Sequence, residues 1–180
     1  MNKLEVTLKV HAFKMNIYFL LYLCRMKILM VCLGNICRSP LADGLLKAKI
    51  EARQLTDSVD SAGTSSFHAG EKPDARMIAT ANSYGVSLSH LRARGFEAKD
   101  FDLFDRIFVM DKSNLQNVLK LARTEADRKK VDLLLNLSHP GENLEVPDPY
   151  YGGDEGFHAV YKMVDEATDV LIKQLEKNDG

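Results

Sequence analysis

The chain has 180 residues, 46% of them hydrophobic, which is enough for one compact core and too few for two large ones. Its 24 Lys and Arg residues balance 25 Asp and Glu residues without a long block of like charge, which argues against a nucleic-acid-binding arm or a polybasic membrane patch. The three cysteines, Cys24, Cys32 and Cys37, are an odd set near the N-terminus. That pattern does not fit a secreted disulfide scaffold and favours the cytoplasm.

Residues 1–25 are interpreted as an extension that lies outside the folded domain. Residues 17–24 are apolar and follow three lysines, as in a signal peptide, but this run is too short to span a bilayer. No small-residue cleavage site follows it, and the first predicted strand comes almost directly after it, so export is the less favoured alternative. We expect residues 26–180 to form a single domain that starts at Met26, without stable membrane association.

After this extension, short apolar runs alternate with longer stretches of helical periodicity. This alternation is typical of βαβ units, in which helices cover both faces of a parallel sheet. Strands are expected at residues 27–32, 58–62, 106–110 and 131–135, and helices at residues 41–54, 74–84, 112–123 and 154–177. The last helix carries an apolar stripe wide enough to dock on a sheet. The predicted fold class is therefore α/β.

The segment VCLGNICRSP, residues 31–40, is predicted to connect the first strand to the first helix. In an open parallel sheet, ligands bind beyond the carboxyl ends of the strands, where such turns converge. Ser39 suits the N-cap position and Pro40 the first helical position. Gly34 and Asn35 tolerate left-handed backbone conformations, which allow successive N–H groups to curl around an anion. The turn is therefore predicted to bind an oxyanion.

The same turn places Cys32 close to a helix N-terminus and to the guanidinium of Arg38. Both favour the thiolate, which is the nucleophilic form of cysteine. The planar guanidinium can also hold two phosphate oxygens at once. The alternative, a buried structural cysteine with an incidental arginine, leaves the coincidence of these features unexplained. The residues therefore predict a thiolate nucleophile at the bottom of a phosphate-binding loop.

The pattern Cys-x5-Arg-Ser after a first strand, here CLGNICRSP, resembles the low-molecular-weight protein tyrosine phosphatases. Three further motifs match in order, namely SAGT at 61–64, MD at 110–111 and DPYYGG at 148–153. The resemblance runs from about Met26 to the last helix and implies a three-layer sandwich with a four-stranded parallel sheet of order 2-1-3-4. It also implies hydrolysis of phosphotyrosine in protein substrates, and of small aryl phosphates, through a cysteinyl-phosphate intermediate.

A phenolate leaving group needs a proton from a positioned acid, and Asp148 is the candidate. Pro147 and Pro149 stiffen its loop, although Asp-Pro alone is a routine turn pair. In the family, the matching aspartate protonates the leaving group and then serves as base for the attacking water. By resemblance, Asp148 is therefore assigned as general acid and base.

The resemblance also assigns the residues around the reacting groups. The expected phosphate-binding residues are Leu33, Gly34, Asn35, Ile36, Cys37, Arg38 and Ser39. The expected pocket wall consists of Leu33, Phe67, Tyr150 and Tyr151, a slot that suits a phenyl ring. Ile36 stands where relatives that act on phosphoarginine carry Thr, which favours phosphotyrosine.

Support and regulation are likewise implied by the resemblance. The Ser39 hydroxyl is expected to donate to the Cys32 thiolate. Asn35, Ser61 and His90 match family positions whose hydrogen bonds fix the loop, with Asp111 as the expected partner of His90. Cys37 is expected to form a reversible disulfide with Cys32 under oxidation.

Two other functions compete with phosphotyrosine hydrolysis. Thioredoxin-coupled arsenate reduction on the same fold needs two further cysteines, and the chain has none after Cys37. A phosphate receptor without turnover would have no use for Cys32 together with Asp148. The histidines show no ligand spacing with any cysteine, so neither a metal nor another cofactor is expected. The oligomeric state is left open.

Overall fold

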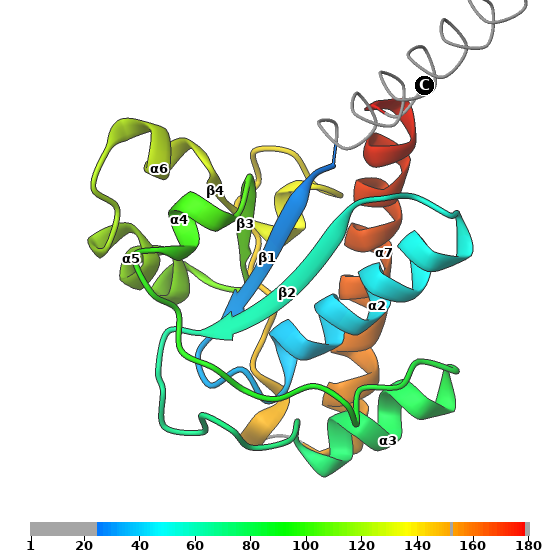
Figure 1. The fold of residues 1–180 in the computed structure, drawn as a ribbon. Coiled ribbons are helices and arrows are strands. Elements are labelled where there is room, and N and C mark those ends of the chain that lie inside the picture. The colour runs from blue at the N-terminus through cyan, green and yellow to red at the C-terminus, as the bar shows by residue number, and fades with distance from the viewer. Residues whose placement is uncertain (1–24, 152, 179–180) are drawn as a thin grey trace, which may run out of the picture.

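The structure is a computed structural model that describes residues 25–151 and 153–178 (Figure 1). The expectations for residues 1–24, which include Cys24, lie outside the described residues. Four strands, β1 (Lys27–Cys32), β2 (Ser58–Gly63), β3 (Arg106–Val109) and β4 (Val131–Leu133), pair in parallel in the order β2-β1-β3-β4. The predicted α/β class and strand order are confirmed.

Helices cover both faces of this sheet (Figure 1). On one face lie α2 (Arg38–Ala52) and α7 (Asp154–Asn178), with α3 (Ala75–Ser83) packed against α7. On the other lie α4 (Asp100–Leu103) and α5 (Lys112–Lys120), and α6 (Glu125–Lys129) contacts β4. Two 3-10 turns, η1 (Leu134–Asn136) and η2 (Pro149–Tyr151), follow β4 and precede α7. No helix in the described part of the chain is long and apolar enough to cross a membrane.

The central strand β1 supplies side chains to both cores. Ile28 and Met30 point toward α2 and α7, whereas Leu29 and Val31 point toward the opposite face, and all four are fully buried. A strand buried on both faces has an unbroken apolar sequence, because successive side chains alternate between two apolar environments. This position places the end of β1, at Cys32, in the middle of the sheet edge.

The first helix differs from the prediction at its start. It begins at Arg38 with Cys37 at the N-cap position, so Ser39 and Pro40 lie inside the first turn. The predicted N-cap role of Ser39 is wrong, because its hydroxyl points inward and donates to Cys32 Sγ and to the Ala62 carbonyl at 3.1 and 3.2 Å. The contacts of Ser39 with Cys32 in β1 and Ala62 in β2 thus outweigh the local preference of serine for the N-cap position.

The short helices α4 and α6 were not predicted. At four and five residues, they are too short to show an apolar periodicity. For α6 a capping signal is present, since Thr124 accepts a hydrogen bond from the Asp127 N–H and acidic residues occupy the first turn. The predicted fourth strand is also too long, because the chain turns into η1 directly after Leu133.

Candidate active site

The loop between β1 and α2 curls around the sulfur of Cys32. Asn35 has a φ of 55°, in the left-handed region that asparagine tolerates. Its backbone N–H donates to Cys32 Sγ at 3.2 Å, and the Ser39 hydroxyl donates to the same sulfur at 3.1 Å. Donors that converge on a sulfur favour its charged form, as a thiolate nucleophile requires.

The side chain of Asn35 fixes this loop from behind. It is almost fully buried, and its Nδ2 donates to Ser39 Oγ at 2.9 Å. Its Oδ1 accepts the Arg94 backbone N–H at 2.9 Å. Asn35 thus ties the loop both to the start of α2 and to the segment that follows α3.

A second buried contact lies under the loop, between α2 and β2. Ser61 Oγ donates to Asp43 Oδ2 at 2.9 Å, and both side chains are buried. Burial raises the pKa of Asp43 to about 7, although the Ser61 hydrogen bond acts in the opposite direction. Asp43 was not among the predicted site residues, because an acidic residue in the middle of a helix is usually exposed.

Arg38 contacts residues from two distant segments of the chain. Its Nη1 lies 2.6 Å from Asp111 Oδ2 and its Nη2 lies 2.8 Å from Asp148 Oδ2. Nη1 also donates to the Val146 carbonyl at 3.1 Å. The arginine side chain is only 3% exposed, whereas those of Asp111 and Asp148 are 21% and 36% exposed. The guanidinium is thus anchored on the buried side while its carboxylate partners reach solvent.

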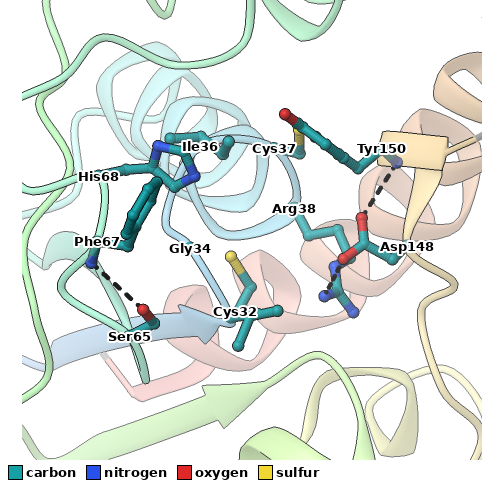
Figure 2. Close-up of a pocket in the computed structure, with 11 residues that line it drawn as sticks. Cys32, Gly34, Ile36, Cys37, Arg38, Ser65, Phe67, His68, Asp148 and Tyr150 are labelled. Carbon is teal, nitrogen blue, oxygen red and sulfur yellow. Dashed lines mark hydrogen bonds and ion pairs between the residues drawn. The ribbon is translucent and has the colours of Figure 1, made fainter.

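Cys32, Arg38 and Asp148 border a cavity of about 370 Å³, which Asp111 and Val146 do not line (Figure 2). Cys32 and Arg38 lie at its floor, Phe67 and His68 on one side, and Tyr150 with Asp148 on the other. The remaining lining residues are Leu33, Gly34, Ile36, Cys37 and Ser65. The volume is at the lower end of the range for small-molecule sites, and aromatic side chains flank a polar floor.

Most of the predicted site residues meet at this cavity. Asn35 and Ser39 lie behind the loop rather than in the cavity wall, and Ser61 lies farther back, with Asp43. The side chain of Tyr151 lies outside the described residues. Phe67 is 84% exposed, so this wall stands free in solvent.

The expected pairing of His90 with Asp111 is wrong. His90 is exposed in the segment after α3. The Asp111 carboxylate has other partners, since Oδ2 contacts Arg38 and Oδ1 accepts the Asn114 backbone N–H as the N-cap of α5. Because Asn35 is held by the Arg94 backbone, the support expected from His90 comes from a neighbouring segment instead.

His68 and Ser65 line the cavity and were not predicted. The His68 ring packs edge-on against Phe67 with centroids 5.0 Å apart, and its Nδ1 lies 2.8 Å from Glu71 Oε2. A Cβ at Gly34 would lie 3.1 Å from His68 Cδ2, so the ring sits directly over the loop. The only sequence feature that could have pointed to His68 was a glutamate three residues later, at position 71, and that spacing is common on protein surfaces.

Cys37 lines the same cavity as Cys32, and both are free thiols in the structure. Burial and the nearby negative charge of Asp74 raise the pKa of the Cys37 thiol. Cys37 is therefore held in the neutral form, in contrast to the donor-rich environment of Cys32. The expected disulfide between them remains a prediction.

Comparison with known proteins places this site in a family. Residues 27–179 match the low molecular weight phosphotyrosine protein phosphatases. A phosphatase of this name from Schizosaccharomyces pombe is 40% identical over 83% of this chain and 96% of its own length. The crystal structure of a protein tyrosine phosphatase from Entamoeba histolytica superposes with a TM-score of 0.78 at 40% identity, covering 84% of this chain and 97% of that chain.

A solved arginine phosphatase from Drosophila is also similar, with a TM-score of 0.76 at 35% identity over 83% of this chain and 97% of that chain. The fold and the site together define a protein tyrosine phosphatase, which is a hydrolase. The chain belongs to the low molecular weight phosphotyrosine protein phosphatase family.

Proposed function

We propose that the chain hydrolyses phosphotyrosine monoesters in protein substrates by transferring the phosphoryl group to Cys32. The observation that carries this proposal is that Asp148, 110 residues from Arg38 in the sequence, lines the same cavity as Cys32 and Arg38 of the β1–α2 loop. Two donors on the Cys32 sulfur support its role as a thiolate nucleophile. The exposed aromatic walls support a substrate with a flat aryl group.

In the first step, the Cys32 thiolate attacks phosphorus and the bond to the tyrosine oxygen breaks. Asp148 gives its proton to the departing phenolate, which leaves as neutral tyrosine. Arg38 donates to two equatorial oxygens and stabilises the charge that spreads over them in the transition state. In this mechanism the incoming phosphate takes over donors of Arg38, so the guanidinium that contacts Asp148 at 2.8 Å also holds the substrate.

In the second step, water attacks the phosphorus of the cysteinyl-phosphate. Asp148, now a carboxylate, accepts the proton of that water, and inorganic phosphate leaves as the S–P bond breaks. The thiolate is the leaving group, so the Asn35 N–H and the Ser39 hydroxyl stabilise the charge that returns to sulfur. The cycle thus restores the starting state of all three groups.

This mechanism uses no metal and no other cofactor. Within residues 25–151 and 153–178, no three His, Cys, Asp or Glu side chains are grouped as a metal ion would need. The absence of a cofactor remains a prediction, as does a cytoplasmic location, which rests on the cysteine pattern in the sequence.

The proposal is tested by trapping the intermediate. Wild-type protein mixed with a ³²P-labelled phosphotyrosine peptide and quenched in alkaline detergent, in which a cysteinyl-phosphate is stable, should carry label on Cys32. Cys32→Ser should carry none and should hydrolyse p-nitrophenyl phosphate only at background rate. Cys32→Ser should unfold near the wild-type Tm, because the two side chains are similar in size. Label on another residue, or substantial turnover by Cys32→Ser, would reject the mechanism. Phosphoarginine, assayed in parallel, should be the poorer substrate.

A further inference from the structure

Arg76, near the start of α3, is held in one orientation by the residue that caps this helix. Its Nε and Nη2 donate to the two carboxylate oxygens of Asp74 at 3.0 and 2.8 Å. Asp74 Oδ1 also accepts the Arg76 backbone N–H at 2.8 Å as the N-cap of α3. A planar guanidinium bound by two parallel hydrogen bonds has a fixed direction. The remaining guanidinium nitrogen, Nη1, therefore points in a fixed direction and is not free to rotate.

That donor reaches the turn that carries the acid. Arg76 Nη1 donates to the Tyr150 carbonyl in η2 at 3.1 Å. The guanidinium carbon also lies 5.3 Å from the ring centroid of Tyr150 and 4.7 Å from that of Phe157, which is fully buried in α7. Both distances are within the range of cation–π attraction. Arg76 thus connects η2 to α3 and to α7.

The connection has an end on each side of the cavity. On one side, the Asp74 backbone N–H donates to the Ile36 carbonyl in the phosphate-binding loop at 2.8 Å. On the other side, the Tyr150 backbone N–H donates to Asp148 Oδ1 at 3.1 Å (Figure 2). A continuous path of hydrogen bonds therefore runs from Ile36 through Asp74, Arg76 and Tyr150 to Asp148. None of its contacts uses Arg38.

This independence matters when substrate binds. Arg38 contacts Asp148 directly at 2.8 Å, but in the proposed mechanism its donors are also needed by the phosphate. A hold that does not depend on Arg38 would keep the acid in place at the moment it transfers its proton. We propose that Arg76, fixed by Asp74, is a positioning residue that holds Asp148 and the ring of Tyr150 in place during catalysis. The inference rests on the proposed function, because it takes Asp148 as the proton donor.

The test uses two substrates that differ in how much they need the acid. Phenyl phosphate has a basic leaving group and p-nitrophenyl phosphate an acidic one. For Arg76→Ala we expect kcat for phenyl phosphate to fall about tenfold and kcat for p-nitrophenyl phosphate only about twofold, because a displaced acid loses part of its contribution. KM should rise for both substrates, since the Tyr150 wall is loosened. Arg76→Lys, which keeps the charge and can reach the Tyr150 carbonyl, should restore part of the loss.

Arg123→Ala is the matched control. Arg123 is similarly exposed and pairs with Asp102 at 2.6 Å, but it lies between α5 and α6, away from the cavity. Its removal should leave the ratio of the two kcat values unchanged. If Arg76→Ala changes that ratio and Arg123→Ala does not, the effect comes from the contact of Arg76 with η2 and not from the loss of an exposed arginine.

A second measurement reports how firmly η2 is held, without using turnover. The chain has no tryptophan, so Tyr150→Trp introduces a single fluorescent reporter in the turn. Time-resolved anisotropy should show faster local motion when Arg76→Ala is added to this variant, and unchanged motion when Arg123→Ala is added.

Asp148→Ala, measured alongside, separates the inference from the proposed function. If Asp148→Ala loses activity selectively on phenyl phosphate while Arg76→Ala leaves both the kcat ratio and the anisotropy unchanged, only the role of Arg76 is rejected. Equal losses on both substrates for Arg76→Ala would likewise reduce Arg76 to a structural residue. If Asp148→Ala itself shows no selectivity, the acid assignment falls and the inference falls with it.

Discussion

At the scale of single residues, Arg38 is shared between the proposed acid and the proposed phosphate site. Its Nη2 lies 2.8 Å from Asp148 Oδ2, and in the proposed mechanism the same guanidinium donates to the phosphate. In that mechanism Asp148 is the proton donor, and one arginine therefore contacts both the substrate and the acid.

This reading predicts selective damage from Asp148→Ala. Activity toward phosphotyrosine should fall about 100-fold or more, the range for loss of a general acid, with a smaller loss toward p-nitrophenyl phosphate. The basic limb of the pH profile of kcat should flatten, since that limb reports the protonated acid. Asp154→Asn is the control, because Asp154 lies close by at the start of α7 and should leave both properties unchanged. Equal losses on both substrates with an intact basic limb would make Asp148 a structural turn residue.

Asp43 shows how a buried carboxyl links the site to pH. Its pKa is raised to about 7 by burial, with the charge of Asp60 acting in the same direction and those of Lys47 and Arg94 in the opposite direction. The folded protein therefore holds this proton up to about pH 7, whereas the unfolded chain releases it near 3.8. The stability that this group contributes is complete below about pH 4 and is lost as the pH rises through 7.

Asp43→Asn removes this titration and keeps an oxygen that can accept from Ser61. The variant should be more stable than wild type at pH 8, by an amount on the order of a few kcal/mol, with the difference shrinking toward pH 4. Urea unfolding across this range measures it. Asp102→Asn, at an exposed ion pair, should show no such trend. A constant difference between Asp43→Asn and wild type at every pH would contradict the raised pKa.

At the scale of elements, the loop between β1 and α2 lies directly against the end of β2. Gly63, which ends β2 and pairs with Cys32, leaves room for the loop backbone. A Cβ at this position would lie 2.8 Å from the carbonyl oxygens of Leu33 and Ser65 and 3.1 Å from the Asn35 nitrogen. These neighbours are backbone atoms, which cannot turn away as the end of a side chain can.

Gly63→Ala should therefore push the loop out of place. We expect it to destabilise the fold by about 1–3 kcal/mol, as overpacking does, and to lower kcat/KM by about tenfold or more because the Asn35 N–H moves relative to the Cys32 sulfur. Thermal unfolding and p-nitrophenyl phosphate hydrolysis measure the two effects. Gly156→Ala in α7, where the added Cβ meets Pro149 at an ordinary 3.8 Å, should keep activity. Wild-type activity in Gly63→Ala would show that the loop tolerates displacement.

At the scale of the whole molecule, the described residues form one sheet between two cores, and the family match begins at residue 27. The boundary at residue 26 is a prediction that a shortened protein can test. The Met26 backbone nitrogen donates to Asp57 Oδ1 at 2.8 Å, so a chain that starts there would place its positive α-amino group beside a carboxylate.

A protein of residues 26–180 should keep kcat/KM within about twofold of the full chain, because all groups in the proposed mechanism lie after Met26. Its Tm should be no lower. A deeper truncation that starts at Leu29 is the comparison, since it removes the first residues of β1 and should prevent folding. Loss of activity on truncation at Met26 would place part of the functional domain in residues 1–25.

Local patterns in the sequence determined much of this protein. The apolar run of β1 and the periodicity of α7 follow from which side chains must be buried, and burial repeats at the period of the backbone. The loop from Cys32 to Ser39 could be predicted to bind phosphate because its chemistry lies in consecutive residues. Asp148 could be proposed as the acid because a phenolate leaving group requires one and the resemblance supplied a candidate.

Tertiary structure alone decided which distant groups meet. Arg38 contacts Asp111 and Asp148 across sequence separations of 73 and 110 residues, and no local pattern encodes such pairings. The exposure of His90 and the burial of Asp43 likewise depend on how α3 and α2 pack, since a polar residue in a loop or helix is compatible with either environment. Periodicity specifies which face of an element is buried, whereas the partner of each polar group is fixed only when the elements are docked.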